Sequence, residues 1–253
     1  GHNLFGNYSL LAAVALKAVI DDLGGEIRVY GTPGEEGGEN GSAKGSYVKA
    51  GFFQNVDAAL CAHPAHKFAP TLRLLANAPV DIEFFGRASH AAGAPEAGIN
   101  ALEALIQVFN SINALRLNLT KDVNIHGIIT NGGQAANVIP EYASGRFYLR
   151  AAERKTLESV YQKVENIVKG AALATGCDYK FGLFQNWVDD VVPTPLFDQL
   201  FFQEVADYGI DESEIERSKR NSLGSSDVGN VSQVVPTIQP TVSISDSPIP
   251  GHS

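Results

Sequence analysis

The sequence contains no methionine, only two cysteines and no excess of positive charge. Cys61 and Cys177 are too few for a disulfide framework and too far apart for a Cys-x-x-Cys metal pair, so we expect two buried, reduced thiols. The 19 lysines and arginines stand against 28 aspartates and glutamates, and a formal charge of −9 argues against a nucleic-acid partner. No uninterrupted apolar run approaches the roughly 20 residues that a membrane helix requires. These absences indicate a soluble protein without a membrane partner, and we expect it to be cytoplasmic.

What is present indicates a globular chain, since 44% of its 253 residues are hydrophobic and 19% are charged. That length allows one large domain or two modest ones. The sequence starts at Gly1 without an initiator methionine and stops at Gly251-His252-Ser253. We therefore expect segments beyond both ends, and methionines that this sequence has lost.

The two ends of the sequence have the alternating helices and strands of an α/β domain. Apolar residues at nearly every helical position predict a buried helix over 8–23, which Gly24-Gly25 ends. The other expected elements are strands at 26–31, 57–62 and 235–245 and helices at 46–50 and 195–208. Residues 211–220 are dense in charge, and we expect a solvated surface helix or loop there. Short links between helices and strands predict a mainly parallel sheet.

Residues 79–188 have a different pattern, which indicates an inserted module. Strand-like alternation and helical spacing predict the order β-α-β-β-α-β, with strands at 80–86, 124–130, 142–150 and 179–185 and helices at 99–112 and 157–171. This is the order of a ferredoxin-like α+β unit. We therefore predict an α/β fold class: a discontinuous domain of residues 1–78 and 189–253 that carries the inserted module at 79–188.

Metal-type side chains follow the carboxyl ends of the predicted strands, where ligands bind in open α/β sheets. They are Glu35 and Glu36 after the first strand, His63 after the second and His252 after the last, with His2 before the first helix. Imidazole nitrogens and carboxylate oxygens suit zinc. Glu35 fits a general base beside a metal-bound water.

Each of these residues also has a simpler interpretation. Glu35-Glu36 resembles a solvated acidic turn when taken alone, and His63 before Pro64 a loop histidine. Cys61 shares a strand face with His63 and is therefore a candidate ligand, although a buried thiol is the better interpretation. We expect His66 not to be a ligand and His126 to be structural. His252 alone could be a tag remnant.

The motifs as an ordered set are more specific than their parts. They are Gly1-His2-Asn3, Gly31 to Gly38, His63-Pro64, Gly86 to Ala91, and Gly251-His252-Ser253. This set resembles the zinc aminoacylase/carboxypeptidase G family of metallopeptidases, in its amidohydrolase branch. Two segments, Glu35 to Phe53 and Ser225 to Ser232, look closest to the subgroup of aminobenzoyl-glutamate hydrolases and dipeptidases for basic dipeptides.

The resemblance implies a role for each matching residue. His2, Glu36, His63 and His252 would be metal ligands, and Glu35 would be the general base. Two divalent ions per active site are implied, zinc first, with manganese or cobalt as alternatives. The branch also has a metal-bridging cysteine immediately before the Gly-His, which would lie one residue upstream of Gly1.

The inserted module resembles the dimerisation domain of the family, which implies a homodimer. His90, in the Ser-His-Ala motif, would reach into the site of the partner subunit and help to hold the oxyanion. Asn137 resembles a substrate-contacting position, and Arg150 is a weaker candidate for binding the substrate carboxylate.

The function that the resemblance implies is that of a metal-dependent amidohydrolase or peptidase. Its substrates would be N-acyl amino acids or dipeptides, such as aminobenzoyl-glutamate or Xaa-basic dipeptides. A deacylase of another conjugate is the alternative within this class. The alternative from another class is a non-catalytic dimeric binding protein that keeps the fold without a competent metal site.

Overall fold

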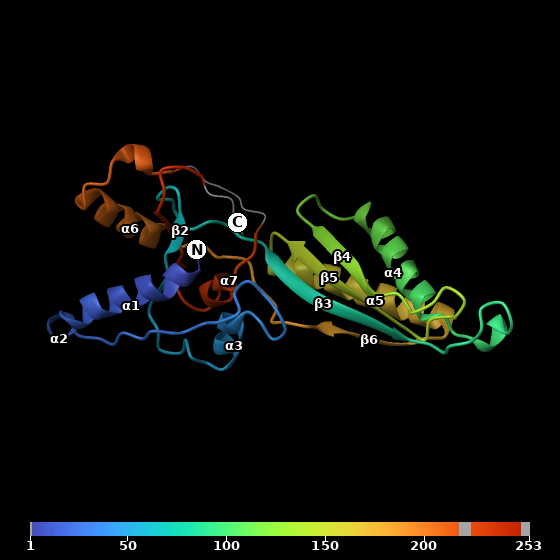
Figure 1. Ribbon diagram of the computed structural model, residues 1–253. Coiled ribbons are helices and arrows are strands. Elements are labelled where there is room, and N and C mark those ends of the chain that lie inside the picture. Colours follow the sequence, from blue (N-terminus) through green and yellow to red (C-terminus); the bar gives the residue numbers. More distant parts are fainter. Residues whose placement is uncertain (1, 218–223, 249–253) are drawn as a thin grey trace. The chain divides into compact units, whose positions relative to one another are not determined.

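The computed structural model describes residues 2–217 and 224–248, which form two compact units (Figure 1). The first unit takes its described residues from Gly1–Glu35, Ala43–Leu74 and Val191–Ser253, and the second takes Glu36–Ser42 and Leu75–Asp190. The first unit is therefore discontinuous, and the predicted fold class, with an inserted module in an α/β domain, is confirmed. The functional boundaries that we placed at 78/79 and 188/189 stay a prediction.

The second unit is a four-stranded antiparallel sheet with two helices. Its elements are β3 (Ala76–Phe85), a short 3-10 turn η1 (Pro95–Ala97), α4 (Ala101–Arg116), β4 (Asn124–Asn131), β5 (Tyr142–Ala151), α5 (Arg154–Thr175) and β6 (Asp178–Leu183). The strand order is β4-β5-β3-β6. This is the ferredoxin-like topology that the sequence pattern predicts.

The core of the second unit follows from the alternation of its strands. Val80, Ile82 and Phe84 of β3 are fully buried, whereas the residues between them are half-buried on the other face. Helices α4 and α5 pack against each other and against β3 and β5. Helix α5 buries one stripe of residues at helical spacing and ends at Gly176, whose φ of +77° allows the left-handed cap.

The first unit contains short parallel strand pairs and several helices. Its elements are α1 (Asn3–Lys17), α2 (Ile20–Leu23), α3 (Ala43–Lys49), β1 (Ala59–Leu60), β2 (His63–Ala65), α6 (Pro195–Asp207), η2 (Glu212–Glu214), α7 (Val228–Ser232), β7 (Thr237–Ile238) and β8 (Thr241–Ser243). Strand β1 pairs with β7 and β2 with β8, both in parallel. The parallel direction agrees with the sequence pattern.

Three expectations for the first unit are wrong in detail. The described residues contain no strand at 26–31, because this extended segment has no neighbouring strand with which to form a ladder. The strand expected at 235–245 is instead two short strands, β7 and β8, separated at Gln239-Pro240, and proline lacks the N–H that a continuous ladder needs.

The third error concerns the burial of the first helix. The helix forms as α1 and α2, but no described residue of α1 is buried, and Leu11, Val14 and Leu23 are 69%, 68% and 73% exposed. A helix that is apolar on all sides needs covering elements, which the described residues do not supply.

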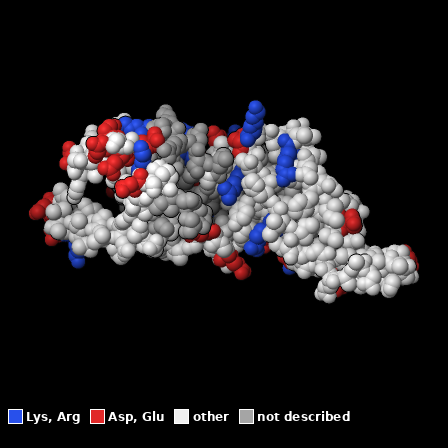
Figure 2. Space-filling view, turned by 45° about the horizontal axis from the view of Figure 1, so that its top comes forward, with Lys and Arg blue, Asp and Glu red and all other residues white. Residues whose placement is uncertain are grey.

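The surface stretch expected at 211–220 is described up to residue 217, and residues 218–220 lie outside the described residues. Figure 2 shows acidic side chains gathered over the region of α6 and η2, where the charge-dense stretch begins. Residues 211–214 there are exposed, as expected for a solvated turn. Within the described parts of the chain, no helix combines the length and the apolar character needed to cross a membrane.

Candidate metal centre

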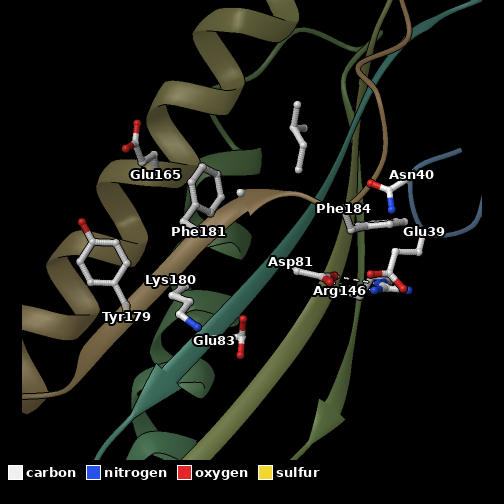
Figure 3. Close-up of a pocket in the computed structure, with 12 residues that line it drawn as sticks. Glu39, Asn40, Asp81, Glu83, Arg146, Glu165, Tyr179, Lys180, Phe181 and Phe184 are labelled. Atoms are coloured by element: carbon white, nitrogen blue, oxygen red, sulfur yellow. Dashed lines mark hydrogen bonds and ion pairs between the residues drawn. The ribbon is translucent and has the colours of Figure 1, made fainter. Parts of the chain in front are cut away.

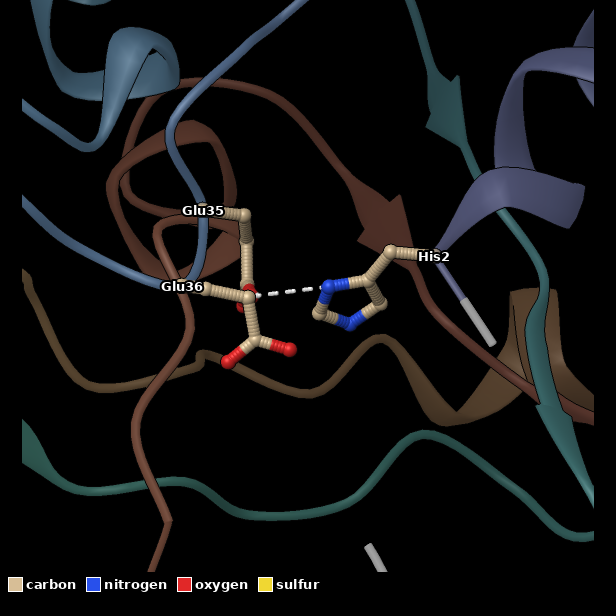
Figure 4. A group of neighbouring side chains, drawn as sticks. All are labelled: His2, Glu35 and Glu36. Atoms are coloured by element: carbon tan, nitrogen blue, oxygen red, sulfur yellow. Dashed lines mark ion pairs between the residues drawn. The ribbon is translucent and has the colours of Figure 1, made fainter. Parts of the chain in front are cut away.

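His2, Glu35 and Glu36 form one group of potential metal ligands (Figure 4). Each residue offers a ligand atom, and these atoms all lie within 4.8 Å of one another. His2 precedes α1, and its Nδ1 lies 3.6 Å from Oε2 of Glu35. The side chains of His2 and Glu35 are 33% and 24% exposed, so the group is accessible to water and to an ion. The structure therefore brings together three residues that the sequence analysis placed at one site.

The position of Glu35 depends on the turn that precedes α3. Gly34 and Gly37, with φ of +74° and +100°, flank the two glutamates and adopt a backbone conformation that other residues rarely reach. The N–H of Ala43 donates to the carbonyl of Pro33 at 3.3 Å and closes the loop at its base. Glu35 and Glu36 consequently lie in a loop whose two ends are joined by this hydrogen bond.

His63 lies beside this group, at the start of β2. The ring centroids of His2 and His63 are 5.6 Å apart in an edge-on arrangement. Nδ1 of His63 donates to the carbonyl of Pro64 at 2.8 Å, which leaves Nε2 as the metal-binding nitrogen. Phe5 contacts both rings, with centroid distances of 5.0 Å to His2 and 5.2 Å to His63. The sequence analysis missed Phe5, whose signal is an aromatic residue one helical turn after His2.

The donor set fits a divalent ion. The imidazoles of His2 and His63 and the carboxylate of Glu36 are of the kinds that zinc takes from proteins, and one ring already has the carbonyl partner that usually orients a metal-binding histidine. His252, the last predicted ligand, lies outside the described residues, as does Gly1.

Cys61 does not resemble a ligand in this arrangement. The residue is half-buried but its thiol is enclosed, and burial raises the pKa of that thiol to about 11. Because the thiolate is the form that binds metals, a neutral thiol favours the interpretation of Cys61 as a packing residue. Cys177 is buried in the core of the second unit, as expected.

The predicted oxyanion and substrate residues lie in the second unit. Nδ1 of His90 accepts hydrogen bonds from the backbone N–H groups of Ala92 and Gly93 at 3.2 and 3.0 Å, so Nε2 of the neutral ring carries the proton. The side chain is exposed and can donate to a ligand. Asn137 lies on the adjacent segment, since its carbonyl accepts the N–H of Ala91 at 3.0 Å. The structure thus places His90 and Asn137 close together.

Arg150 lies at the other end of the same sheet. Phe85 pairs with Tyr142 at one end of β3 and β5, and Asn77 pairs with Arg150 at the other. The two ends are eight residue steps apart along β3, which corresponds to roughly 27 Å. His90 follows the Phe85 end of β3 by five positions, and its neighbour Ala91 is bonded to Asn137, which precedes the Tyr142 end of β5. His90 and Arg150 of one chain therefore do not meet within this unit.

A hollow of about 870 Å³ lies on the face of β3, β5 and β6 (Figure 3). Arg146 makes two hydrogen bonds of 2.7 Å to Asp81 there, and its guanidinium stacks 3.9 Å from the ring centre of Phe184. The side chains of Arg146 and Asp81 are more than a third exposed, and exposed ion pairs contribute little energy. The predicted site residues do not line this hollow, and we assign it no function.

Comparisons with known proteins show which family the chain resembles. Residues 77–175 match the family model of the M20-type peptidase dimerisation domain. The Xaa-Arg dipeptidase of Mus musculus is 34% identical over 244 residues, which are 95% of this chain and 56% of that protein. One of the subunits of the p-aminobenzoyl-glutamate hydrolase of Escherichia coli is 35% identical over 84% of this chain and 44% of its own length.

A solved structure has a similar fold. The aminobenzoyl-glutamate utilization protein from Klebsiella pneumoniae superimposes with a TM-score of 0.65 and 21% identity, over 77% of this chain and 52% of that one. The chain spans about half the length of the curated relatives that it matches.

Proposed function

Because this chain belongs to the M20 peptidase family, we propose that the protein is a metal-dependent amidohydrolase. It cleaves the amide bond of an N-acyl amino acid or a dipeptide. The observation that carries this proposal is the convergence of His2, Glu35 and Glu36 within 4.8 Å, with the ring of His63 beside them. Two imidazoles and one carboxylate that can hold an ion, with a second carboxylate beside them to act as a base, have the chemistry of a hydrolytic metal site.

His2, Glu36, His63 and His252 would hold the metal, which we propose to be two zinc ions, with manganese or cobalt as alternatives. When bound, a divalent ion polarises a substrate carbonyl and lowers the pKa of a water molecule. Glu35 takes the proton of the attacking water and delivers it to the leaving amine. His90 donates its Nε2–H to the oxyanion that develops on the substrate carbonyl.

The substrate class rests on the names of the relatives. They are an Xaa-Arg dipeptidase and part of a p-aminobenzoyl-glutamate hydrolase, so we propose a dipeptide with a basic residue or a conjugate similar to aminobenzoyl-glutamate. Asn137 and Arg150 would bind the substrate. We also propose that the whole protein is a cytoplasmic homodimer that forms through the second unit.

The sharpest test replaces the proposed base. In the protein with its natural ends, Glu35→Gln should keep the metal and lower kcat by at least about 100-fold, because the amide cannot take the water proton. Elemental analysis gives the ions per chain, and hydrolysis of aminobenzoyl-glutamate and Xaa-Arg dipeptides gives kcat.

The matched control is Glu39→Gln, in the same loop but outside the ligand group, which should retain turnover. Turnover retained by Glu35→Gln would contradict the role of the base. A wild-type protein that holds no metal and hydrolyses no amide would instead favour the non-catalytic binding protein.

A further inference from the structure

The two segments that resemble the dipeptidase subgroup, Glu35 to Phe53 and Ser225 to Ser232, meet through one ion pair. Nζ of Lys44 lies 2.8 Å from Oδ1 of Asp227, and the backbone N–H of Lys44 donates to Oδ2 of the same carboxylate at 3.1 Å. The two residues are 183 positions apart in the sequence. One residue therefore occupies both oxygens of Asp227, once through its side chain and once through its backbone.

Burial makes this pair unusual among the ion pairs of the described residues. The side chain of Asp227 is 0% exposed and that of Lys44 17%. A buried ion pair is often no more stabilising than an apolar pair of the same size, since desolvation offsets the attraction. Stability alone is therefore a weak reason for two charges at this place, and their fixed geometry is the property that an apolar pair would lack.

The pair fixes α3 to α7. Lys44 is in the first turn of α3, where a backbone N–H has no partner within the helix, and Asp227 supplies that partner from the residue before α7. Helix α3 in turn holds the segment that carries Glu35. The hydroxyl of Tyr47 donates to the carbonyl of Gly31 at 2.8 Å, and the N–H of Ala43 donates to the carbonyl of Pro33 at 3.3 Å.

The segment after α7 is also joined to the segment that contains His63. The N–H of Cys61 donates to the carbonyl of Ile238 at 3.2 Å, and the N–H of His63 donates to the carbonyl of Pro240 at 2.9 Å. Cys61 lies between β1 and β2, and His63 is the first residue of β2. The ion pair therefore links α3 to α7, and the strands that follow α7 pair with β1 and with β2, which begins at the proposed ligand His63.

We propose that Lys44 and Asp227 are positioning residues of the metal centre, which hold the turn with Glu35 and the adjoining Glu36 at the spacing from His2 that metal binding requires. They touch neither metal nor substrate and act through α3. This inference rests on the proposed function, because it needs a metal to be bound.

The test measures metal affinity in the protein with its natural ends, by calorimetric titration of the metal-free protein with Zn²⁺ alone. Asp227→Asn keeps an acceptor for the N–H of Lys44 but removes the charge, and Lys44→Met removes the cation. Both should weaken Zn²⁺ binding at least about tenfold, the loss typical of groups that orient ligands. Lys44→Arg keeps the charge and should restore most of the affinity. In parallel, kcat should fall in the first two variants while KM changes little.

The matched control is Asp198→Asn. Asp198 is also a buried aspartate of the first unit, and it accepts the N–H and the hydroxyl of Thr71 at 3.1 and 2.8 Å. Its replacement should lower the melting temperature without changing Zn²⁺ affinity.

The possible outcomes separate the two claims. A wild-type protein that binds Zn²⁺ and hydrolyses substrate, with Asp227→Asn and Lys44→Met of unchanged affinity, would overturn the positioning role and leave the proposed function intact. Failure of both Asp227→Asn and Lys44→Met to fold would also overturn the positioning role, and the ion pair would then be purely structural. A wild-type protein without Zn²⁺ binding or hydrolysis would contradict the proposed function itself.

Discussion

Phe5 contacts the rings of both His2 and His63, and it does so from the first turn of α1. The two contacts are tilted and edge-on, and aromatic pairs in such geometries contribute about 0.5–1.5 kcal/mol beyond their buried area. Because the orientation of an imidazole determines where its nitrogen points, a residue that restrains two rings preorganises two ligands at once.

We predict that Phe5→Ala weakens Zn²⁺ binding by about three- to tenfold, which corresponds to one lost aromatic contact. Phe5→Leu, which keeps apolar bulk against the rings, should weaken it less. Titration of the metal-free protein with Zn²⁺ measures the change. The control is Phe53→Ala, which removes a half-buried ring that packs on Tyr30 and not on the histidines. The Zn²⁺ affinity of this variant should equal that of the wild type. Equal losses for Phe5→Ala and Phe53→Ala would contradict the assigned role.

At the scale of the elements, the second unit contains one tightly packed glycine after β3 and one glycine in α5 with open space around it. Gly86 follows β3, and a Cβ there would lie 2.0 Å from the carbonyl oxygen of Ile99, in a backbone that Arg87 and Ile99 hold by two hydrogen bonds of 2.9 Å. Gly170 lies on the exposed side of α5, and a Cβ there would meet nothing within 4 Å. The same substitution should therefore have opposite effects at these two positions.

We predict that Gly86→Ala destabilises the second unit by about 1–3 kcal/mol, because the backbone must shift. Gly170→Ala should stabilise it by about 1 kcal/mol, since alanine favours the helix and no atom blocks it. Urea unfolding followed by tryptophan fluorescence measures both, as the single tryptophan, Trp187, belongs to this unit. A stabilising Gly86→Ala, or a destabilising Gly170→Ala, would contradict this difference in packing.

For the whole molecule, the separation of His90 and Arg150 along one sheet has a consequence for assembly. If Arg150 binds substrate in the site of its own chain, His90 of that chain is roughly 27 Å of strand away and serves another site. The proposed homodimer meets this requirement, because each chain can supply His90 to its partner.

We predict that two inactive variants restore activity when they are mixed. In a heterodimer of His90→Ala and Glu35→Gln, the first chain keeps Glu35 and receives His90 from the second, so one of the two sites is complete. Random mixing after reversible dissociation should recover about one quarter of the wild-type kcat per site. Steady-state hydrolysis before and after mixing is the measurement. Activity that stays at the level of the separate variants would show that His90 acts within its own chain or not at all.

The sequence by itself determined the identity of the chemical groups and most of the elements. Helical spacing and strand alternation predicted β3, α4, β4, β5, α5 and β6 in order, since these patterns reflect which side of each element faces a core. The motif order indicated the family and named His2, Glu35, Glu36 and His63 before any contact was known.

The tertiary structure alone decided which of these elements have partners and which residues meet. The segment 26–31 has strand-like residues but forms no strand, because a ladder needs a neighbour that local sequence cannot supply. Helix α1 has the composition of a buried helix and is exposed for the same kind of reason. The contacts of Phe5 with His63 and of Lys44 with Asp227 join positions far apart in the chain, and only the packing of α1, α3, α7 and β2 brings them within reach. Local propensity acts over a few residues, whereas a site depends on distances between elements, and packing alone determines those distances.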